Sequence, residues 1–256
     1  MNAVATVSQY SAFNVYLIEA KLEFIRMLRM PMFALPALVF PGMFYLLFGV
    51  LMGKGKADVA AYLLATYCIF GVMGPGLFGF GVSVALEKDR GWLKWRRAVP
   101  ALPGAYFVSK MVMALIFAFF IFIELSLLAA GFGGVELTML QWSKLMIVSL
   151  LSSLPFCALG LVIGILVNGQ AAPAIVNFIY LPMAFLSGLW LPINLLPKFL
   201  GTIAPIWPSY HAAQIALKVI GDDLGTPIWI HISYLIVFTL AMLWLAVTFW
   251  SRMKLK

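Results

Sequence analysis

The sequence predicts an all-α polytopic membrane protein that crosses the bilayer six times. Of its 256 residues, 64% are hydrophobic and only 10% are charged, whereas soluble domains have about 45–50% apolar and about 25% charged residues. The apolar runs are also long enough to cross about 30 Å of hydrocarbon, which takes roughly 20 helical residues. Because these runs are continuous and do not alternate, we expect helices rather than barrel strands.

Six runs meet the length requirement, and each is predicted to form one transmembrane helix. They cover residues 31–52, 61–86, 107–131, 143–167, 171–191 and 228–250. No large soluble domain remains between them, so residues 1–256 are predicted to form a single transmembrane domain.

The cationic residues indicate how these helices are oriented. With both termini in the cytoplasm, twelve of the 17 Lys and Arg residues fall on the cytoplasmic side and five on the outer side. The twelve are Lys21, Arg26, Arg29, Lys88, Arg90, Lys94, Arg96, Arg97, Lys110, Arg252, Lys254 and Lys256. The positive-inside rule therefore predicts cytoplasmic termini in a bacterial-type plasma (inner) membrane. The net charge of +8 is attributed to this topology and not to nucleic-acid binding.

Residues 8–30 are predicted to form an amphipathic helix that lies at the membrane interface. Apolar and charged residues mix at helical spacing here. The apolar residues are Phe13, Tyr16, Leu17, Ala20 and Phe24, and the charged ones are Glu19, Glu23 and Arg26. We expect the apolar face to enter the headgroup boundary while Lys21, Arg26 and Arg29 contact anionic lipid. Pro31 then marks the turn into the first span.

Two glycine-rich stretches resemble nucleotide-binding motifs but do not satisfy them. GPGLFG at residues 74–79 lies inside a predicted span and not between a strand and a helix, and GVLMGKGK at residues 49–56 lacks the spacing and the Ser or Thr of a phosphate loop. Glycines in spans instead permit close helix contact. Gly160 and Gly164 form a GxxxG pair of this kind.

Residues 192–227 are predicted to re-enter the membrane or lie on it as short helices. The segment is too apolar for a free loop, and four prolines break it. Ser209 is expected to cap a helix that ends at Gly221.

The stretch ALEKDRGWLKWRRAVP, residues 85–100, concentrates charge in the predicted cytoplasmic loop 87–106. On a helix, Arg90, Lys94 and Arg97 share one face, while Trp92, Trp95 and Val99 gather on the opposite face. Such a two-faced helix suits either an anchor for lipid phosphates or a surface that docks another protein. The spacing alone leaves both alternatives open.

Glu87-Lys88-Asp89-Arg90-Gly91, followed by Pro100, resembles the E-x-E-R-G…P signature of the ABC-2 type exporter permeases. FLSGLWLPINLLP at residues 185–197 resembles the SG…P…LP element of that family, and residues 205–210 resemble the proline-containing stretch after it. With six spans and an amphipathic N-terminal helix, the similarity covers nearly the whole chain.

The resemblance implies a permease subunit that pairs with a second copy of itself, as a homodimer, or with a close relative, and with two copies of a separate cytoplasmic ABC ATPase. The loop would then be the coupling helix that sits in a groove on the ATPase. The residues assigned to this contact are Glu87, Arg90, Gly91, Trp92, Lys94, Trp95 and Arg97. Lys94 replaces an acid of the family pattern, which implies an acidic groove. ATP and Mg would bind the partner, and this chain would hold no cofactor or catalytic residue.

Polar groups inside the spans are candidates for a translocation path or a dimer seam. Glu124 is the one acid well inside a predicted span, and intramembrane ionisable groups are often functional. The other candidates are Asn177, Ser187, Gly188, Pro192 and Pro197. Five phenylalanines of the first two spans are candidates to line an apolar substrate route: Phe40, Phe44, Phe70, Phe78 and Phe80.

No residue set with metal-ligand spacing is found. His211 and His231 lie apart in sequence without a Cys or acidic companion, and Cys68 and Cys157 both fall inside spans. We therefore predict no metal site and no disulfide.

The sequence favours the membrane-spanning subunit of an ATP-driven exporter for an amphipathic, lipid-like or drug-like compound, with glycolipid or polysaccharide also compatible. The main alternative is an ion-coupled carrier or channel that uses Glu124. A membrane anchor or assembly protein without transport activity is the third.

Overall fold

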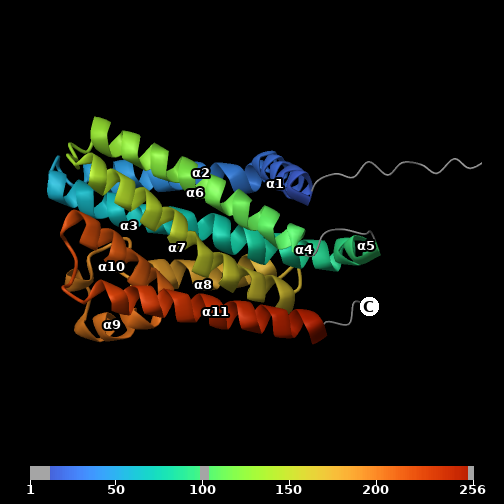
Figure 1. The fold of residues 1–256 in the computed structure, drawn as a ribbon. Coiled ribbons are helices and arrows are strands. Elements are labelled where there is room, and N and C mark those ends of the chain that lie inside the picture. The colour runs from blue at the N-terminus through green and yellow to red at the C-terminus, as the bar shows by residue number, and fades with distance from the viewer. Residues whose placement is uncertain (1–11, 99–103, 253–256) are drawn as a thin grey trace, which may run out of the picture.

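The computed structural model describes residues 12–98 and 104–252, and every regular element within them is a helix. The bundle consists of α2 (Pro31–Phe44), α3 (Ala57–Gly76), α6 (Ala105–Gly131), α7 (Met139–Leu166), α8 (Ala172–Leu186) and α11 (Ile228–Arg252), as Figure 1 shows. The remaining α-helices are α1 (Ala12–Leu28), α4 (Ser83–Asp89), α5 (Trp92–Ala98), α9 (Lys198–Ile203) and α10 (Pro208–Ile220). Two π-helical segments, η1 (Tyr45–Leu51) and η2 (Leu77–Val82), continue α2 and α3.

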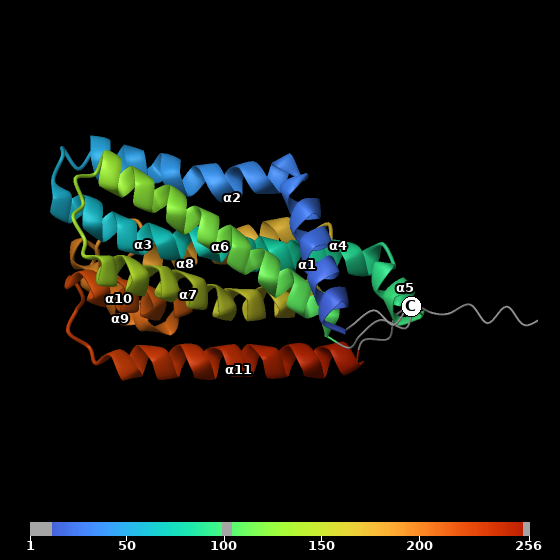
Figure 2. The same ribbon diagram turned by 45° about the horizontal axis from the view of Figure 1, so that its top comes forward.

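The two ends of the bundle differ in what they carry. α1, α5 and the end of α11 lie at one end, called here the α5 end (Figures 1 and 2). The opposite end, called here the distal end, carries α9, α10 and the loop between α6 and α7 (Figure 1). The first and last described helices therefore reach the same end of the molecule.

The structure confirms a multi-pass membrane protein but not all six predicted spans. Among the described residues, five helical stretches are long and apolar enough to cross a membrane: Pro31–Leu51, Ala57–Asp89, Ala105–Gly131, Met139–Leu166 and Ile228–Arg252. The predicted span 171–191 corresponds to α8, whose 15 residues extend about 22 Å, less than the hydrocarbon core. It is shorter than predicted because the chain turns at Gly188, where φ is +77°.

The predicted turn between the N-terminal helix and the first span is present at Pro31. α1 ends at Leu28, and Pro31 is the first residue of α2, where a proline costs no helical hydrogen bond. Figure 2 shows α1 crossing the end of the bundle while α2 runs along it. The outward face of α1 exposes large apolar side chains: Phe13, Leu17, Ile18, Leu22 and Leu28.

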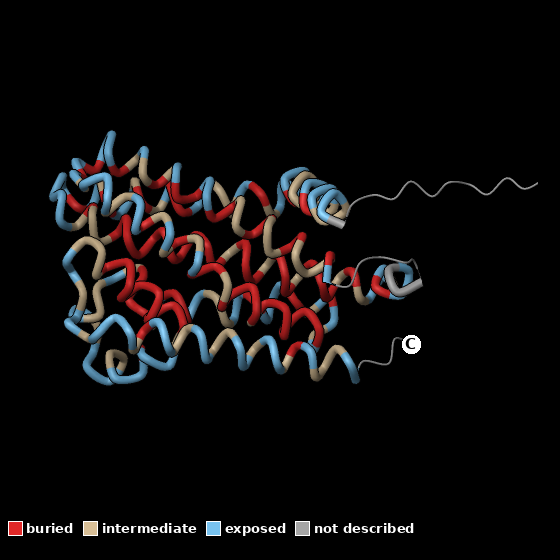
Figure 3. The backbone as a smooth tube through the Cα atoms, in the orientation of Figure 1, coloured by how far each residue is buried: buried red, intermediate tan, exposed pale blue. Residues whose placement is uncertain are grey.

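The core is built around α3 and α7, whose buried residues form the centre of the bundle (Figure 3). The predicted GxxxG contact is confirmed: a Cβ on Gly160 would lie 2.5 Å from the carbonyl oxygen of Gly76, and one on Gly164 would lie 2.8 Å from Cβ of Val84. The absence of side chains at these two positions lets α7 approach η2 and α4 closely. By contrast, α11 buries only His231 and Ala246 of its described residues.

The segment before α11 folds as a series of short helices, as expected of a proline-broken apolar stretch. Two 3-10 turns, η3 (Ile193–Leu195) and η4 (Ala204–Ile206), flank α9, and α10 is buried from Pro208 to Leu217. α10 ends at Gly221 with φ +85°, as predicted. The predicted cap is wrong: Ser209 makes no cap bond, because its Oγ bonds the hydroxyl of Ser187 and thereby ties α10 to α8.

The contact at Gly160 predicts a large difference between two equivalent substitutions. Gly160→Val forces a side chain against the backbone of Gly76, and overpacking of this kind costs about 1–3 kcal/mol. Gly74→Val is the matched control, since no heavy atom lies within 4 Å of its Cβ position. Thermal unfolding of the purified protein in detergent should show a lower midpoint for Gly160→Val than for Gly74→Val. Equal midpoints would show that the close approach does not stabilise the fold.

Candidate functional site

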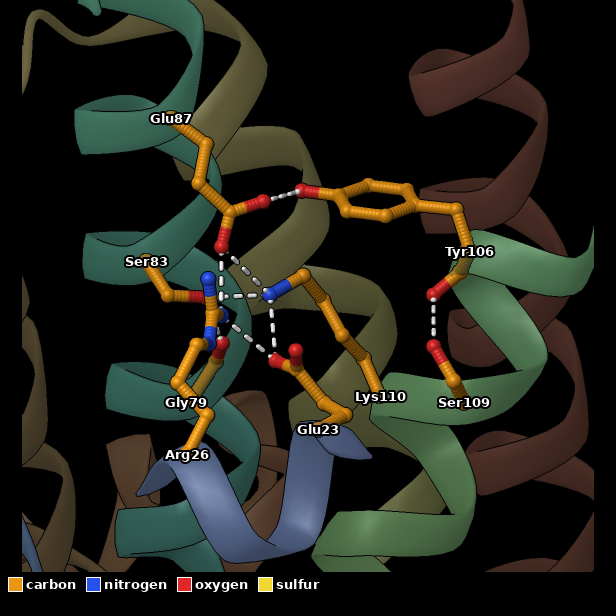
Figure 4. A network of polar contacts seen from close by, with 8 residues as sticks. All are labelled: Glu23, Arg26, Gly79, Ser83, Glu87, Tyr106, Ser109 and Lys110. Carbon is orange, nitrogen blue, oxygen red and sulfur yellow. Dashed lines mark hydrogen bonds and ion pairs between the residues drawn. The ribbon is translucent and has the colours of Figure 1, made fainter. Parts of the chain in front are cut away.

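A buried cluster of charged side chains lies where α1, α4 and α6 meet at the α5 end (Figure 4). Its centre is Lys110 of α6, which has no exposed surface. The Lys110 ammonium donates to Glu23 Oε1 at 2.7 Å, to Ser83 Oγ at 2.7 Å and to Glu87 Oε1 at 3.0 Å. A buried ammonium is tolerated only when its charge and its donors are satisfied in this way.

Arg26 completes the cluster from α1. Its guanidinium contacts Glu23 at 2.7 Å and Glu87 at 2.5 Å. Burial lowers the pKa of Arg26, but the carboxylates of Glu87 and Glu23 outweigh this effect and hold it above its ordinary value. Tyr106 donates its hydroxyl to the second oxygen of Glu87. Two acids thus face two bases, and α1 is tied to α4 and α6.

This cluster corrects two expectations. Arg26 was expected to contact anionic lipid, and Glu87 was expected to contact the ATPase. In the structure the two side chains contact each other instead: Arg26 keeps 38% of its side chain exposed, while Glu87 also pairs with Lys110. Glu87 is only 9% exposed to solvent. A helical wheel shows that residues share a face, but it does not show which neighbouring helix covers that face.

The two residues after Glu87 anchor the same segment to α7 and to the start of α8. The ammonium of Lys88 donates to the carbonyl oxygens of Ile165 at 2.8 Å and Val167 at 2.7 Å, which lie at the C-terminal end of α7. A cation is favourable at a helix C-terminus. The Asp89 carboxylate accepts from the backbone N–H of Gly169 at 2.6 Å. The base of the loop is therefore held on several sides.

The tip of the loop is exposed. Gly91 adopts φ +75°, a left-handed conformation that turns the chain from α4 into α5, and Arg90 beside it is exposed. In α5, Leu93 is buried, whereas Trp92 and Trp95 are 60% and 76% exposed. Lys94 is exposed as well, so the tip presents both aromatic and cationic side chains to the surroundings.

For three further residues of this loop, the side chain or the whole residue lies outside the part of the chain that the structure describes. The backbone of Arg97 is helical, but its side chain falls outside the described residues, as do Val99 and Pro100.

An apolar groove of about 370 Å³ lies farther along the bundle, between α2, α3 and α8. Four of the five phenylalanines proposed for a substrate route line it: Phe40, Phe44, Phe70 and Phe78. Phe80 does not, because it packs in a separate cluster with Val84 and Cys157. Tyr180, Trp190 and Asn177 complete the wall. The Asn177 amide donates to the carbonyl of Pro173 on its own helix, and the Tyr180 hydroxyl donates to the carbonyl of Phe70.

The remaining predicted path residues do not form one site. Glu124 lies against α2, where Gly42 leaves room for its carboxyl: a Cβ on Gly42 would fall 2.1 Å from Glu124 Oε1. Ser187 bonds Met183 and Ser209, and the carbonyl of Gly188 accepts from the Tyr62 hydroxyl at 2.8 Å. These contacts support a structural role for Ser187 and Gly188.

Pro192 and Pro197 precede η3 and α9 at the distal end. Pro192 lines a cavity at the distal end, whereas Pro197 lines neither that cavity nor the apolar groove.

Sequence reasoning missed one contact of the histidines. His211 of α10 and His231 of α11 approach each other to 2.9 Å between their Nδ1 atoms and are both buried. No group of three or more potential metal ligands occurs among the described residues. Cys68 and Cys157 are buried free thiols, as predicted.

Comparison with known proteins gives two matches. The profile of the family described as ABC-2 type transporter matches residues 15–220. A protein of Bacillus subtilis (strain 168) named "Putative transport permease YvfS" is 27% identical over 236 residues, which cover 91% of this chain and 96% of that relative. The matched region includes the charge cluster, the loop and the groove.

Because Lys110 is at the centre of the charge cluster, substituting it should destabilise the fold. Lys110→Met would leave the buried carboxylates of Glu23 and Glu87 with one cation between them, and breaking a buried ion pair costs about 3–5 kcal/mol. We expect a clear drop in the thermal unfolding midpoint. Lys144→Met, at an exposed site on α7, is the control and should leave it unchanged. The double variant Lys110→Met/Glu87→Gln should recover part of the loss, and a wild-type midpoint for Lys110→Met would contradict this assignment.

Proposed function

Because this chain belongs to the ABC-2 type transporter family, we propose that it is the membrane-spanning permease subunit of an ATP-driven exporter. The observation that carries the proposal is the contrast within one short loop. Its base, Glu87 to Asp89, is fixed to the bundle by buried ion pairs and hydrogen bonds, while its tip presents Trp92, Lys94 and Trp95 to the surroundings. A loop held in this way can receive a force at its tip and pass it to the helices.

The proposed partner is a separate cytoplasmic ABC ATPase, present in two copies, which binds ATP and Mg. This chain contributes no ATPase site and no cofactor of its own. Closure of the two ATPases around ATP would move the grooves that hold α5. Exposed ion pairs contribute only about 0–1 kcal/mol each, so burial of Trp92 and Trp95 in the groove supplies most of the affinity.

The force would reach the spans through the charge cluster and its neighbours. Glu87 joins the loop to α6 through Lys110 and to α1 through Arg26, and Lys88 joins it to the end of α7. In this scheme Glu87 is a positioning residue and Arg90, Gly91, Lys94 and the tryptophans form the docking surface. The α5 end is then cytoplasmic, with both termini on that side of a bacterial-type inner membrane.

The groove between α2, α3 and α8 is the proposed route for an amphipathic, lipid-like or drug-like substrate. Its aromatic wall suits apolar parts of such a compound, and Asn177 offers one polar contact. The helices that line it, α2 and α8, also expose apolar side chains that do not line the groove, among them Leu35, Val39 and Phe178. A second copy of the permease would complete the path as a homodimer.

An ion-coupled mechanism through Glu124 remains the second candidate. The observation in its favour is that Glu124 Oε2 is buried and has no hydrogen-bond partner among the described residues. The contact with Gly42 also fits a purely structural carboxyl, which fills the space that the glycine leaves.

The docking surface makes a first functional prediction. Trp95→Ala should remove most of the affinity for the ATPase, and Gly91→Ala should misdirect α5, because an L-residue at φ +75° is strained by about 1–2 kcal/mol. Both variants should fold normally yet fail to stimulate ATP hydrolysis when reconstituted with the ATPase in proteoliposomes. The controls are Trp229→Ala and Gly225→Ala, which alter an equally exposed tryptophan and a glycine with φ +82° near the distal end.

Two outcomes would contradict the coupling role. One is wild-type stimulation of the ATPase by Trp95→Ala and Gly91→Ala. The other is transport that proceeds without ATP, follows a pH gradient and stops in Glu124→Gln, which would support the ion-coupled candidate instead.

The groove makes a second prediction. Gly74→Leu adds a side chain into the groove without touching a neighbour at Cβ. ATP-dependent movement of a fluorescently labelled phospholipid, used as the probe, should therefore fall sharply while the fold is retained. Gly131→Leu, at an equally open glycine at the end of α6 and away from the groove, is the control. Equal transport by the two variants would show that the substrate does not pass through the groove.

A further inference from the structure

A second and larger cavity, of about 770 Å³, opens at the distal end. It lies between the turn that joins η1 to α3, the chain from Trp190 to Leu195, and the end of α10. Ligand sites in proteins usually enclose about 300–1,000 Å³, so the cavity is large enough for one. None of the residues assigned to coupling lines this cavity. Trp190 lines both this cavity and the apolar groove and separates the two.

The inner part of the cavity combines apolar walls with two polar groups. Leu63, Leu217 and Trp190 form the walls. The Tyr62 hydroxyl donates to the carbonyl of Gly188, so its oxygen remains able to accept. Gln214 is 3% exposed and uses its Oε1 to accept from the backbone N–H of Leu224, while none of the hydrogen bonds found for the described residues uses its Nε2. One acceptor and one donor are thus available at the floor.

The mouth of the cavity carries two cations and two anions. Lys54 and Lys56 come from the turn before α3, Asp58 from the first turn of α3, and Asp222 from the chain after α10. None of these four takes part in a salt bridge of the described structure. Nearby, Lys218 and Asp223 do pair with each other, at 2.7 Å, so the region can form ion pairs when the geometry allows.

The surroundings of the mouth are apolar. Met52 and Leu195, which line the cavity, are 63% and 73% exposed, and Leu51 beside Met52 is 71% exposed. A molecule in the cavity would therefore have its polar part among charges and its apolar part along exposed hydrocarbon.

We propose that the distal cavity binds a zwitterionic phospholipid with a primary ammonium, of the phosphatidylethanolamine class, from the adjacent leaflet. The phosphate contacts Lys54 and Lys56, the ammonium donates to Asp58 and Asp222, and the acyl chains follow Met52 and Leu195. Charge complementarity selects this occupant. An anionic lipid without an ammonium leaves the two carboxylates unpaired, and a wholly polar solute leaves the apolar walls without a partner.

The experiment measures lipid retention by the full chain and needs no ATPase. The purified permease is equilibrated with equal amounts of phosphatidylethanolamine, phosphatidylglycerol and phosphatidylcholine, and the lipids that remain bound are identified by native mass spectrometry. We expect phosphatidylethanolamine to be retained about tenfold over the other two, since charge-assisted hydrogen bonds at both ends of the headgroup require it. Phosphatidylcholine cannot donate hydrogen bonds from its quaternary ammonium, and phosphatidylglycerol has no ammonium.

Variants assign the two charges of the headgroup separately. Lys54→Gln/Lys56→Gln should weaken retention of all three phospholipids, because all contain phosphate. Asp58→Asn/Asp222→Asn should abolish the preference for phosphatidylethanolamine while retaining phosphate binding. Asn194→Trp, an exposed position of the cavity wall, should block retention without changing a charge. Each variant is first checked by its thermal unfolding midpoint in lipid-free detergent.

The controls are Lys198→Gln and Glu136→Gln, two exposed charges at the same end that do not line the cavity. They should retain lipid as the wild type does. Equal retention of the three lipids by the wild type, a preference for phosphatidylglycerol, or equal losses in the control variants would each overturn the proposal.

Discussion

The arrangement of the α5 end depends on the burial of one ammonium group. Transfer of an unpaired charge into the interior of a bundle is very costly, so Lys110 can lie there only if Glu23 and Glu87 lie beside it. These partners come from α1 and α4, which are separated from Lys110 by 87 and 23 residues along the chain. The requirement therefore fixes where α1 crosses the bundle and how α4 leaves it, and with them the position of the loop.

The rest of the loop extends the same principle to backbone groups. The last carbonyl oxygens of a helix have no helical partner, and the ammonium of Lys88 donates to three carbonyls at the end of α7, those of Gly164, Ile165 and the following Val167. The carboxylate of Asp89 likewise accepts a hydrogen bond from the backbone N–H of Gly169, which precedes α8. Every charged side chain from Glu87 to Asp89 is thus used within the subunit. Exposed groups begin at Arg90, and after the turn at Gly91 they include Trp92, Lys94 and Trp95, which separates an anchoring part from an exposed part.

The sequence predicted the elements that depend on local properties. Length and hydropathy located five of the spans, Pro31 located the turn after α1, and Gly221 located the end of α10. The fifth predicted span, residues 171–191, was predicted too long because apolar composition continues past Gly188, where the chain turns. The ion cluster could not be predicted, because its members lie on three helices and pairing depends on their packing. Lys110, so close to the start of an apolar span, was the available signal. The contact of His211 with His231 was missed for the same reason.

The composition of the cluster also determines what it can do during movement. It contains two carboxylates, one ammonium and one guanidinium, so its net charge is zero. A single buried cation would resist displacement, because any movement toward hydrocarbon raises its desolvation cost. A neutral group of four charges avoids most of that cost as long as its members remain together. The helices α1, α4 and α6 can therefore shift as a unit, whereas movement of one of them alone would separate the charges and be opposed. Joint movement of this kind is what the proposed coupling of the loop to the spans requires.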